Sequence, residues 1–242
     1  MIGLAEASAC SAHEPAAPAG FRVWRAGLMA YRDAQSRQEE LVARRPHWPF
    51  DLLILLEHPP VITFGRNSDA SNLVWGVERL RAAGIDRVVS RRGGDITLHS
   101  PGQLVGYPIV DLTHYRRDLH RFLRLLEEVL LRTLAEHGVV GEAVPGKTGV
   151  WVEGRKIASI GIAVRRWISY HGFALNIDND LALFQAIIPC GLPGIAMTSM
   201  RQELGRPLDR QAVAETLMAH FGALLQRPLL GPFHDASITA QA

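Results

Sequence analysis

Cysteine is scarce in this chain of 242 residues, where only Cys10 and Cys190 occur. Small secreted domains usually depend on several disulfides, and two cysteines cannot form such a framework. Cys10 lies in a segment rich in alanine and proline that we expect to be flexible, which argues against a bond to the internal Cys190. The cysteine content therefore predicts a reducing, cytoplasmic compartment and a free thiol at Cys190.

Long apolar runs are also missing. A membrane-spanning helix needs roughly 20 apolar residues, whereas the longest runs here, such as Leu52–Leu56, have the size of a core strand. Residues 1–20 have neither a basic start nor a continuous apolar stretch, so no secretory signal is predicted. Hydrophobic residues make up 48% and charged residues 21% of the chain. We expect one soluble domain over residues 21–230, loose tails at 1–20 and 231–242, and no membrane contact.

Several signatures of bound groups are absent from the sequence. There is no CxxC, no HExxH and no tight cluster of His, Asp and Glu, which argues against a metal site. Without a GxxxxGKS/T, GxGxxG or GxSxG pattern, neither a nucleotide site nor an α/β-hydrolase is predicted. The net charge is +2 and the arginines are scattered, which argues against nucleic acid. We therefore expect no metal, no cofactor and no nucleic-acid partner.

Lysine is as rare as cysteine. Of the 26 basic residues only Lys147 and Lys156 are lysines, and both lie in PGKTGVWVEGRKIASIG. In a chain whose basic residues are nearly all arginine, two lysines can occur by chance, and this interpretation is sufficient for Lys147. Lysine, unlike arginine, can lose its proton or act as a compact ammonium beside a nucleophile. Lys156 is therefore a candidate for chemistry.

Strand-like and helical runs come in groups. The clearest helix covers residues 119–137, where apolar residues recur at three- and four-residue spacing. Three strand-like runs follow it, the first two joined by a hairpin-like connection at 153–154. Other strands are predicted at 21–28, 51–57, 61–66, 86–91 and 104–112, and other helices at 31–45, 77–83, 181–187 and 210–225. Such meanders with helices between them indicate an α+β fold, that is, an α/β mixed and largely antiparallel sheet flanked by helices.

The segment Arg92–Asp111, RGGDITLHSPGQLVGYPIVD, carries four glycines and two prolines among strand-like residues. Glycine inside a strand is disfavoured and usually marks a bulge or a close approach of another molecule to the backbone. Two polar side chains, Thr97 and His99, stand two residues apart in the strand-like run. We predict that this segment holds a ligand.

Cys190 lies in IIPCGLPG, where proline and glycine on both sides predict a loop. Most internal cysteines are inert apolar residues, whereas loop residues on a rigid scaffold are more often functional; both interpretations stay open at this point. A nucleophilic thiol needs a nearby cation or helix N-terminus that favours the thiolate. Lys156, on a neighbouring strand-like run, is the economical source of that cation. We interpret His99 and His171 first as hydrogen-bonded structural residues.

Four segments, in this order, resemble one known family: EHPPVITFGR at 57–66, the glycine-rich residues 91–112, residues 146–177, and IIPCG at 187–191. They are similar to the octanoyltransferases of lipoate synthesis and together cover nearly all of residues 50–200. The resemblance implies the catalytic-domain fold that this family shares with biotin-protein and lipoate-protein ligases.

The resemblance also implies roles for particular residues. Cys190 would carry the acyl group as a thioester, and Lys156 would lie beside it and favour the thiolate. Three segments would line the acyl pocket: Arg92, Gly93, Gly94, Asp95, Ile96, Thr97, Leu98 and His99; Ser159, Ile160 and Gly161; and Gly172, Phe173 and Ala174. No ATP would be needed, because a thioester donor is already activated.

The resemblance names partners as well. The donor would be octanoyl-acyl carrier protein. The acceptors would be lipoyl domains of 2-oxoacid dehydrogenase E2 subunits and the glycine cleavage H protein. Two positions depart from the family pattern, which commonly has tyrosine and glycine where this chain has Leu98 and Ser100. We predict that the missing tyrosine hydroxyl alters the pocket wall and thereby the preferred acyl length.

Other functions fit parts of the same pattern. An ATP-dependent lipoate-protein or biotin-protein ligase would keep the fold without a nucleophilic cysteine. An amidotransferase would move octanoyl groups between two lipoyl domains, and would work without acyl carrier protein. A lipid chaperone would bind the acylated carrier without reacting, and a hydrolase pairing Cys190 with His171 would release free octanoate.

Overall fold

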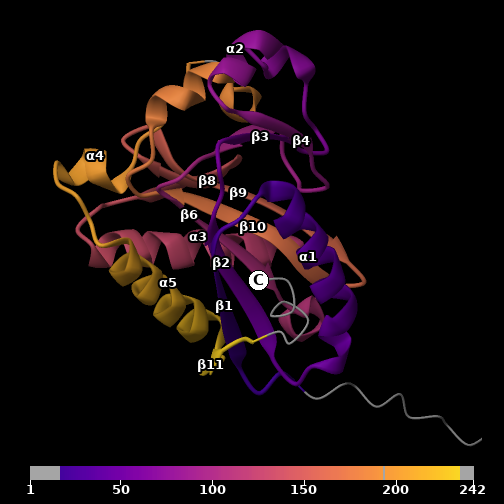
Figure 1. Ribbon diagram of the computed structural model, residues 1–242. Coiled ribbons are helices and arrows are strands. Elements are labelled where there is room, and N and C mark those ends of the chain that lie inside the picture. Colours follow the sequence, from indigo (N-terminus) through magenta and orange to yellow (C-terminus); the bar gives the residue numbers. More distant parts are fainter. Residues whose placement is uncertain (1–16, 193, 235–242) are drawn as a thin grey trace, which may run out of the picture.

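The computed structural model describes residues 17–192 and 194–234. Its larger sheet contains β1 (Phe21–Leu28), β2 (Asp51–Glu57), β6 (Gln103–Ile109), β7 (Glu142–Val144), β8 (Lys147–Val152), β9 (Arg155–Arg165), β10 (Ile168–Asn176) and β11 (Leu229–Pro232). The strand order is β11-β1-β2-β6-β10-β9-β8-β7 (Figure 1). β1 is parallel to β2 and β11, and the other neighbours are antiparallel. The prediction of a mixed, largely antiparallel sheet is confirmed.

Both faces of this sheet are covered. Along β2, Leu53 and Leu55 join the core beneath α3 (Leu119–Glu136) and α5 (Arg210–Leu225). The alternate residues Leu52, Ile54 and Leu56 join the core beneath α1 (Tyr31–Arg44). Figure 1 shows α3 and α5 together on one side of the sheet and α1 on the other. A strand buried on both faces reads as a continuous apolar run, which explains the sequence DLLILLE.

The ends of α3 follow from two residues that the sequence supplies. Asp118 precedes the helix, and its Oδ1 accepts a hydrogen bond of 3.0 Å from the amide of Arg121, which satisfies one of the unpaired donors of the first turn. Gly138 follows the helix with a φ of +86°, a left-handed conformation that glycine adopts without steric cost. The predicted helix over 119–137 is therefore confirmed to within one residue.

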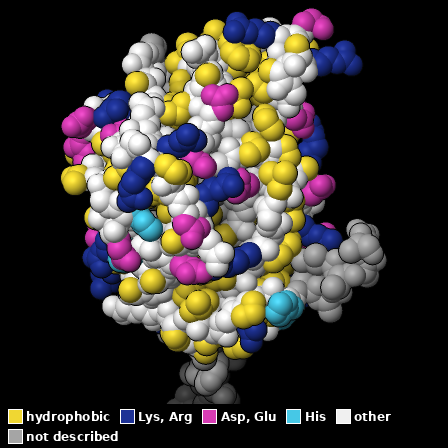
Figure 2. Space-filling view, turned by 60° about the vertical axis from the view of Figure 1, so that its left-hand side comes forward, with side chains coloured by type: hydrophobic (Ala, Val, Ile, Leu, Met, Phe, Trp, Pro, Cys, Tyr) yellow, Lys and Arg dark blue, Asp and Glu magenta, His cyan; other side chains and the backbone are white. Residues whose placement is uncertain are grey.

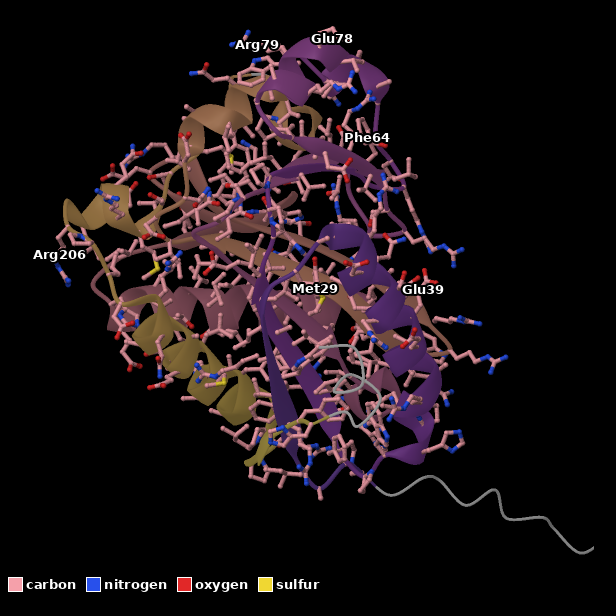
Figure 3. All side chains as sticks on the ribbon, viewed as in Figure 1. Met29, Glu39, Phe64, Glu78, Arg79 and Arg206 are labelled. Atoms are coloured by element: carbon pink, nitrogen blue, oxygen red, sulfur yellow. The ribbon has the colours of Figure 1, made fainter. Side chains whose placement is uncertain are left out.

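A smaller sheet stands beside the large one. It contains β3 (Val61–Phe64), β4 (Asp86–Val89) and β5 (Ile96–His99), in the order β4-β3-β5. Its core includes Ile62, Leu98 and Phe184 and is closed by Leu80 of α2 (Val77–Ala82). Figure 3 shows Glu78 and Arg79 of α2 on the outside of this lobe, at the top of the view.

Short elements connect these parts. They are the 3₁₀ helices η1 (Arg45–His47), η2 (Ala70–Asn72), η3 (Leu112–Tyr115), η4 (Leu181–Ala186) and η5 (Pro189–Gly191), and the α-helix α4 (Met200–Leu204). The helix predicted at 181–187 is the 3₁₀ helix η4. No sequence pattern predicted β7, β11 and α4, because elements of three to five residues have too few positions to show a period.

The C-terminal boundary extends beyond the predicted one. Residues 231–232, which we expected in a loose tail, belong to β11 and continue its pairing with β1. Phe233 is buried against Trp48 and Phe50. Apolar packing of this single ring extends the domain past residue 230. The predicted N-terminal tail falls mostly on residues 1–16, which lie outside the described residues together with Cys10.

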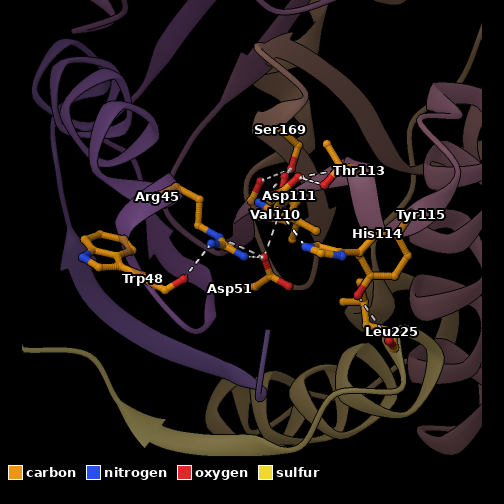
Figure 4. A network of polar contacts seen from close by, with 11 residues as sticks. Arg45, Trp48, Asp51, Val110, Asp111, Thr113, His114, Tyr115, Ser169 and Leu225 are labelled. Atoms are coloured by element: carbon orange, nitrogen blue, oxygen red, sulfur yellow. Dashed lines mark hydrogen bonds and ion pairs between the residues drawn. The ribbon is translucent and has the colours of Figure 1, made fainter. Parts of the chain in front are cut away.

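A buried ion pair fixes the start of β2 to the end of α1 (Figure 4). Arg45 donates from Nε and Nη2 to Asp51 Oδ1 at 3.0 and 2.6 Å, and from Nη1 to the carbonyl of Trp48. The amide of Asp111 donates to the same carboxylate oxygen at 3.1 Å. Removal of one partner would leave a charge buried without compensation, so this network orders three segments at one end of the sheet.

The surface carries charges of both signs. Figure 2 shows basic and acidic side chains interspersed over one face of the molecule, in agreement with the scattered arginines of the sequence. Within the described residues, no helix has the length and apolar character needed to cross a membrane.

Candidate active site

Cys190 and Lys156, 34 residues apart in the chain, lie in direct contact. The Nζ of Lys156 donates a hydrogen bond of 3.3 Å to the Sγ of Cys190. Lys156 is only 2% exposed, whereas Cys190 is partly accessible. A lysine is therefore fixed beside a reachable thiol, which is the kind of environment in which nucleophilic cysteines are found.

The pairing of its strand, β9, determines the direction of the Lys156 side chain. A register irregularity in the β8–β9 pairing lies beside it, with Val150 opposite Ala158 but Trp151 opposite Lys156. Such bulges redirect a side chain. The backbone of Lys156 is held on its other edge by hydrogen bonds to residues 196 and 198, and its Nζ also donates to the carbonyl of Thr148 at 2.9 Å. The ammonium therefore has fixed partners on two sides.

The backbone of Cys190 is held in an uncommon conformation. Cys190 has a φ of +58° and Gly191 a φ of +65°. A non-glycine residue in this region costs about 1 kcal/mol or more and persists only where its surroundings enforce it. Here the carbonyl of Asn72 accepts from the amide of Ile188 at 2.7 Å. A methyl carbon on Gly191 would lie 2.5 Å from Asp95 Oδ2, so only glycine lets the cysteine loop pack against Asp95.

A cavity extends from Cys190 between the two sheets. Most of the residues predicted to bind substrate line it: Arg92, Gly94, Asp95, Ile96, Thr97, His99, Ser159, Ile160, Gly161, Gly172, Phe173 and Ala174. These come from the loop before β5 and from β5, β9 and β10. The topology thus brings three distant segments of sequence to one wall, while their binding role stays a prediction.

Two of the predicted residues lie outside the lining. Leu98 is fully buried in the core of the small sheet and is not among the residues that line the cavity, whereas Thr97 and His99 line it from the other face of β5. Gly93 contributes a backbone contact instead, because its amide donates a hydrogen bond of 2.9 Å to the carbonyl of Ile162. Ser100 is also buried outside the lining. The described cavity therefore does not include Leu98, which was expected in the pocket wall.

Arg92 is a buried cation in the cavity wall. Its Nε and Nη2 donate to Thr63 Oγ1 at 3.0 and 2.9 Å, and Nη1 donates to the carbonyl of Gly93 at 3.1 Å. Among the described residues no carboxylate forms an ion pair with it. Burial lowers the pKa of Arg92 from its ordinary value, and the nearby phenol of Tyr31 and thiol of Cys190 oppose that shift. Arg92 thus contributes a second positive charge to the site.

Tyrosines and histidines form the remaining wall. The ring of Tyr31 stacks on His99 and on His171, with centroids 5.7 and 6.5 Å apart, and its hydroxyl bonds Ser90 at 2.8 Å. Behind them, His58 Nδ1 donates to the carbonyl of Met29 at 2.6 Å, so its Nε2 accepts from the hydroxyl of Tyr107 at 2.7 Å. Both contacts suit a neutral imidazole.

Burial keeps these histidines uncharged. Desolvation lowers the pKa of His58 to about 4 and that of His171 to about 3, and it lowers the pKa of His99 well below its ordinary value. Arg92 adds to the effect on His99 and His171. Within residues 17–192 and 194–234, no three His, Cys, Asp or Glu side chains are grouped so that they could hold a metal ion.

Comparison with known proteins gives the family. Residues 30–222 match the family model of the lipoyl protein ligase A/B catalytic domain. An octanoyltransferase of Geobacter metallireducens is 45% identical over 212 residues, which cover 87% of this chain and 95% of the relative. One from Gloeobacter violaceus is 52% identical over 168 residues, covering 69% and 73%. This chain belongs to the octanoyltransferase family.

Solved structures show the same fold beyond the octanoyltransferase family. A bipartite lipoate protein ligase from Thermoplasma acidophilum superposes with a TM-score of 0.70 at 15% identity, over 91% of this chain and 89% of that one. A lipoate-protein ligase A bound with ATP superposes with a TM-score of 0.70 at 16% identity, over 89% and 88%. The predicted ligase-like fold is therefore confirmed.

Several residues of this site were not found from the sequence. Tyr31 and Tyr107 line the cavity. Tyr107 lies in the glycine-rich segment, between Gly106 and Pro108, and that context could have drawn attention to it. Tyr31 begins a helix far away in the chain and carries no comparable signal. Only the packing of α1 against β10 places it beside the cavity.

Proposed function

We propose that this octanoyltransferase moves an octanoyl group from acyl carrier protein to a lysine of a lipoyl domain through a thioester at Cys190. The observation that carries the proposal is the 3.3 Å contact between Lys156 Nζ and Cys190 Sγ at the mouth of a cavity lined by glycine-rich strands. Cys190 and Lys156 are the proposed catalytic residues, and the cavity residues named above are the proposed acyl-binding wall.

In the first step, the thiolate of Cys190 attacks the carbonyl carbon of the donor thioester. The bond from that carbon to the carrier's sulfur breaks, and the departing thiolate takes a proton from the ammonium of Lys156. One thioester replaces another, so this exchange has little free-energy cost. The products are an octanoyl-Cys190 enzyme with a neutral Lys156 and a carrier with a free thiol.

In the second step, the amine of the acceptor lysine attacks the same carbonyl carbon. Its proton passes to neutral Lys156, the bond between carbon and Sγ breaks, and the thiolate of Cys190 is restored beside an ammonium. An amide replaces a thioester, which is downhill, so neither ATP nor another cofactor is required. Lys156 serves as acid in one step and as base in the next.

The cavity supports the choice of an acyl group. Gly172 lies directly beside β6 in the sheet, since an added methyl carbon would lie 2.0 Å from the carbonyl oxygen of Gly106. Phe173 and Ile160 supply apolar surface. Burial of a hydrocarbon contributes about 0.8 kcal/mol per methylene. The neutral histidines add hydrogen-bonding groups to the wall without adding charge beside the chain.

The test is the intact mass of the purified protein after incubation with octanoyl-acyl carrier protein. We expect the wild type to gain one octanoyl group and to pass it to a lipoyl domain. Cys190→Ala should gain none and should lose transfer, by a factor on the order of 10⁴ or more. Cys190→Ser should retain very little activity. Cys10→Ala is the matched control, since it removes the other cysteine, and should behave as the wild type.

The same experiment separates the alternatives. Turnover by Cys190→Ala would refute the thioester mechanism. Release of pyrophosphate from ATP and free octanoate would indicate a ligase. Transfer from an octanoylated lipoyl domain without acyl carrier protein would indicate an amidotransferase. Free octanoate formed without an acceptor would indicate a hydrolase, and a bound acyl carrier without any adduct would indicate a chaperone.

A further inference from the structure

Glu127 is a buried carboxylate that the steps above do not use. It lies in α3 among the core residues Leu126, Val129 and Leu130, and its side chain is 2% exposed. A carboxylate taken from water costs several kcal/mol unless its oxygens are paired. Its neighbour Glu128 has the same chemistry but is 44% exposed and pairs with Arg132 on the surface. Glu127, unlike Glu128, is therefore held in the core by its hydrogen-bond partners.

The two oxygens of Glu127 have different partners. Oε2 accepts from Nη1 of Arg124, whose side chain is 56% exposed. Oε1 accepts a hydrogen bond of 3.0 Å from the backbone amide of Gly149. The carboxylate thus bonds a solvent-exposed cation on one side and a peptide group of β8 on the other.

That peptide group leads to the reactive pair. The carbonyl of Thr148 and the amide of Gly149 are the two ends of one peptide unit. The amide donates to Glu127, while the carbonyl accepts from Lys156 Nζ at 2.9 Å. Lys156 in turn donates to Cys190 Sγ. Four groups therefore form a continuous chain of hydrogen bonds from the core of α3 to the thiol.

The backbone conformation of Gly149 and the lack of a side chain there allow Lys156 to approach this peptide unit closely. Its φ of +119° is a conformation that L-residues other than glycine rarely adopt. A methyl carbon there would lie 3.0 Å from Lys156 Cε, 3.2 Å from Nζ and 2.5 Å from the carbonyl oxygen of Ala158. The lysine stem therefore packs directly against the peptide unit that Glu127 holds.

We propose that Glu127 is a positioning residue, which orients the Thr148–Gly149 peptide unit and, through it, stabilises the ammonium of Lys156 beside Cys190. A charged acceptor on the amide polarises the peptide and makes its carbonyl a stronger acceptor for Nζ. This role rests on the proposed function of the Cys190–Lys156 pair. Other charged groups around the ammonium are Lys147, which lies over the same Trp151 ring, and Arg92, which acts on Cys190.

The decisive variant is Glu127→Gln, which keeps an oxygen for the amide of Gly149 and removes the negative charge. A purely structural role would leave the reactive pair unchanged. We expect instead that the pH profile for alkylation of Cys190 by iodoacetamide moves about one unit higher, so that alkylation below the midpoint slows about tenfold. Glu128→Gln, the adjacent control, should leave the profile unchanged, and Glu127→Asp should recover part of the effect because it retains the charge.

The chain offers a second readout. With only two lysines, a lysine-labelled protein gives two side-chain nitrogen signals in NMR, and exposed Lys147 serves as the internal reference. In Glu127→Gln the signal of Lys156 should titrate at lower pH than in the wild type, while that of Lys147 should not move. A folded Glu127→Gln protein with both profiles unchanged would overturn the proposal.

Should Glu127→Gln fail to fold, Arg124→Gln decides the matter, because it alters only an exposed side chain. Loss of this cation should leave more of the negative charge of Glu127 to act on the peptide unit. We expect the alkylation profile to move to lower pH, and an unmoved profile would refute the proposal. Neither readout uses an acyl group, so failure of octanoyl transfer itself would be recognised separately.

Discussion

Two polar clusters lie beside the same cavity, one around a lysine and a cysteine and the other around uncharged histidines. The reactive pair, Cys190 and Lys156, lies where a cation, a peptide carbonyl and a buried carboxylate follow one another through hydrogen bonds. The ring cluster, made of Tyr31, His58, His99, Tyr107 and His171, has comparable burial but is arranged for neutral groups.

The difference shows what decides ionisation in a buried site. Desolvation disfavours charge in both clusters. Beside Lys156, the carbonyl of Thr148 is a fixed acceptor, and the carboxylate of Glu127 bonds the other end of the same peptide unit. In the ring cluster no carboxylate offsets desolvation among the described residues, and Arg92 adds to its effect at His99 and His171, so these histidines stay neutral. Burial also raises the pKa of Tyr107 well above its ordinary value, although Arg92 opposes that shift. The part of the wall formed by these histidines is therefore uncharged, whereas Arg92 contributes a positive charge to the same cavity.

After the loss of Cys190 itself, the largest effect is expected when Lys156 is replaced by a residue that keeps the positive charge. Lys156→Arg keeps a cation but does not release its proton at neutral pH. We expect octanoylation of Cys190 in a single turnover to slow by about 10² or more. Lys147→Arg, the matched control at the other lysine, should be unaffected. Near-normal rates for Lys156→Arg would show that charge alone suffices in the reactive pair.

The ring cluster should make the fold sensitive to acid. The pKa of His58 is about 4 in the folded state because of burial, against about 6.5 in an unfolded chain. Below pH 6.5 the unfolded state therefore binds more protons than the folded state. The contribution of His58 to the free energy of unfolding is fully present above pH 6.5 and is lost as pH falls toward 4. Between pH 7 and pH 5 the loss is about 2 kcal/mol for this histidine.

Urea unfolding of the wild type, of His58→Gln and of the exposed control His47→Gln across this range measures that loss. His58→Gln should flatten the dependence of the free energy of unfolding on pH, and His47→Gln should not. Equal slopes in all three proteins would mean that His58 titrates in the folded state as in water, which would remove the contrast between the clusters.

A change in the cavity wall should act on packing without touching the reactive pair. Gly106→Ala would place a methyl carbon 2.1 Å from Cζ of Phe173, a ring of the wall. Overpacking of this kind costs about 1–3 kcal/mol. We expect weaker octanoylation but an unchanged pH profile for alkylation of Cys190. Gly76→Ala, where an added methyl meets nothing within 4 Å, is the control for thermal unfolding.

The smallest effect is expected at Leu98. Since its side chain packs in the core of the small sheet, Leu98→Met should cost less than about 1.5 kcal/mol. The preference between octanoyl and decanoyl donors should not change. Ile160→Ala, in the lining, should shift that preference toward the longer chain. A shift in Leu98→Met would show that the core of the small sheet controls the shape of the cavity.

Local sequence patterns predict much of the fold. Apolar periodicity and the residues flanking it locate α3, and the continuous apolar run locates β2. Leu98 shows the limit of such reasoning. Its place in a glycine-rich segment indicated a pocket residue, but a strand has two faces and the sequence does not say which one meets the cavity. Glu127 and Glu128 are likewise equivalent by composition, and only helix packing buries one of them.

The amino-acid sequence defines which chemical groups are available to this protein. It fixes a rare lysine and a loop cysteine, a glycine-rich wall, and a fold class that follows from the alternation of apolar residues. The tertiary structure alone decided how these groups act on one another. Contacts between residues 34 and 22 positions apart, from Cys190 to Lys156 and from Gly149 to Glu127, depend on the register of β8 and β9 and on the packing of α3 beneath them. Electrostatic effects fall with distance and grow with desolvation, and neither quantity exists until the chain is folded.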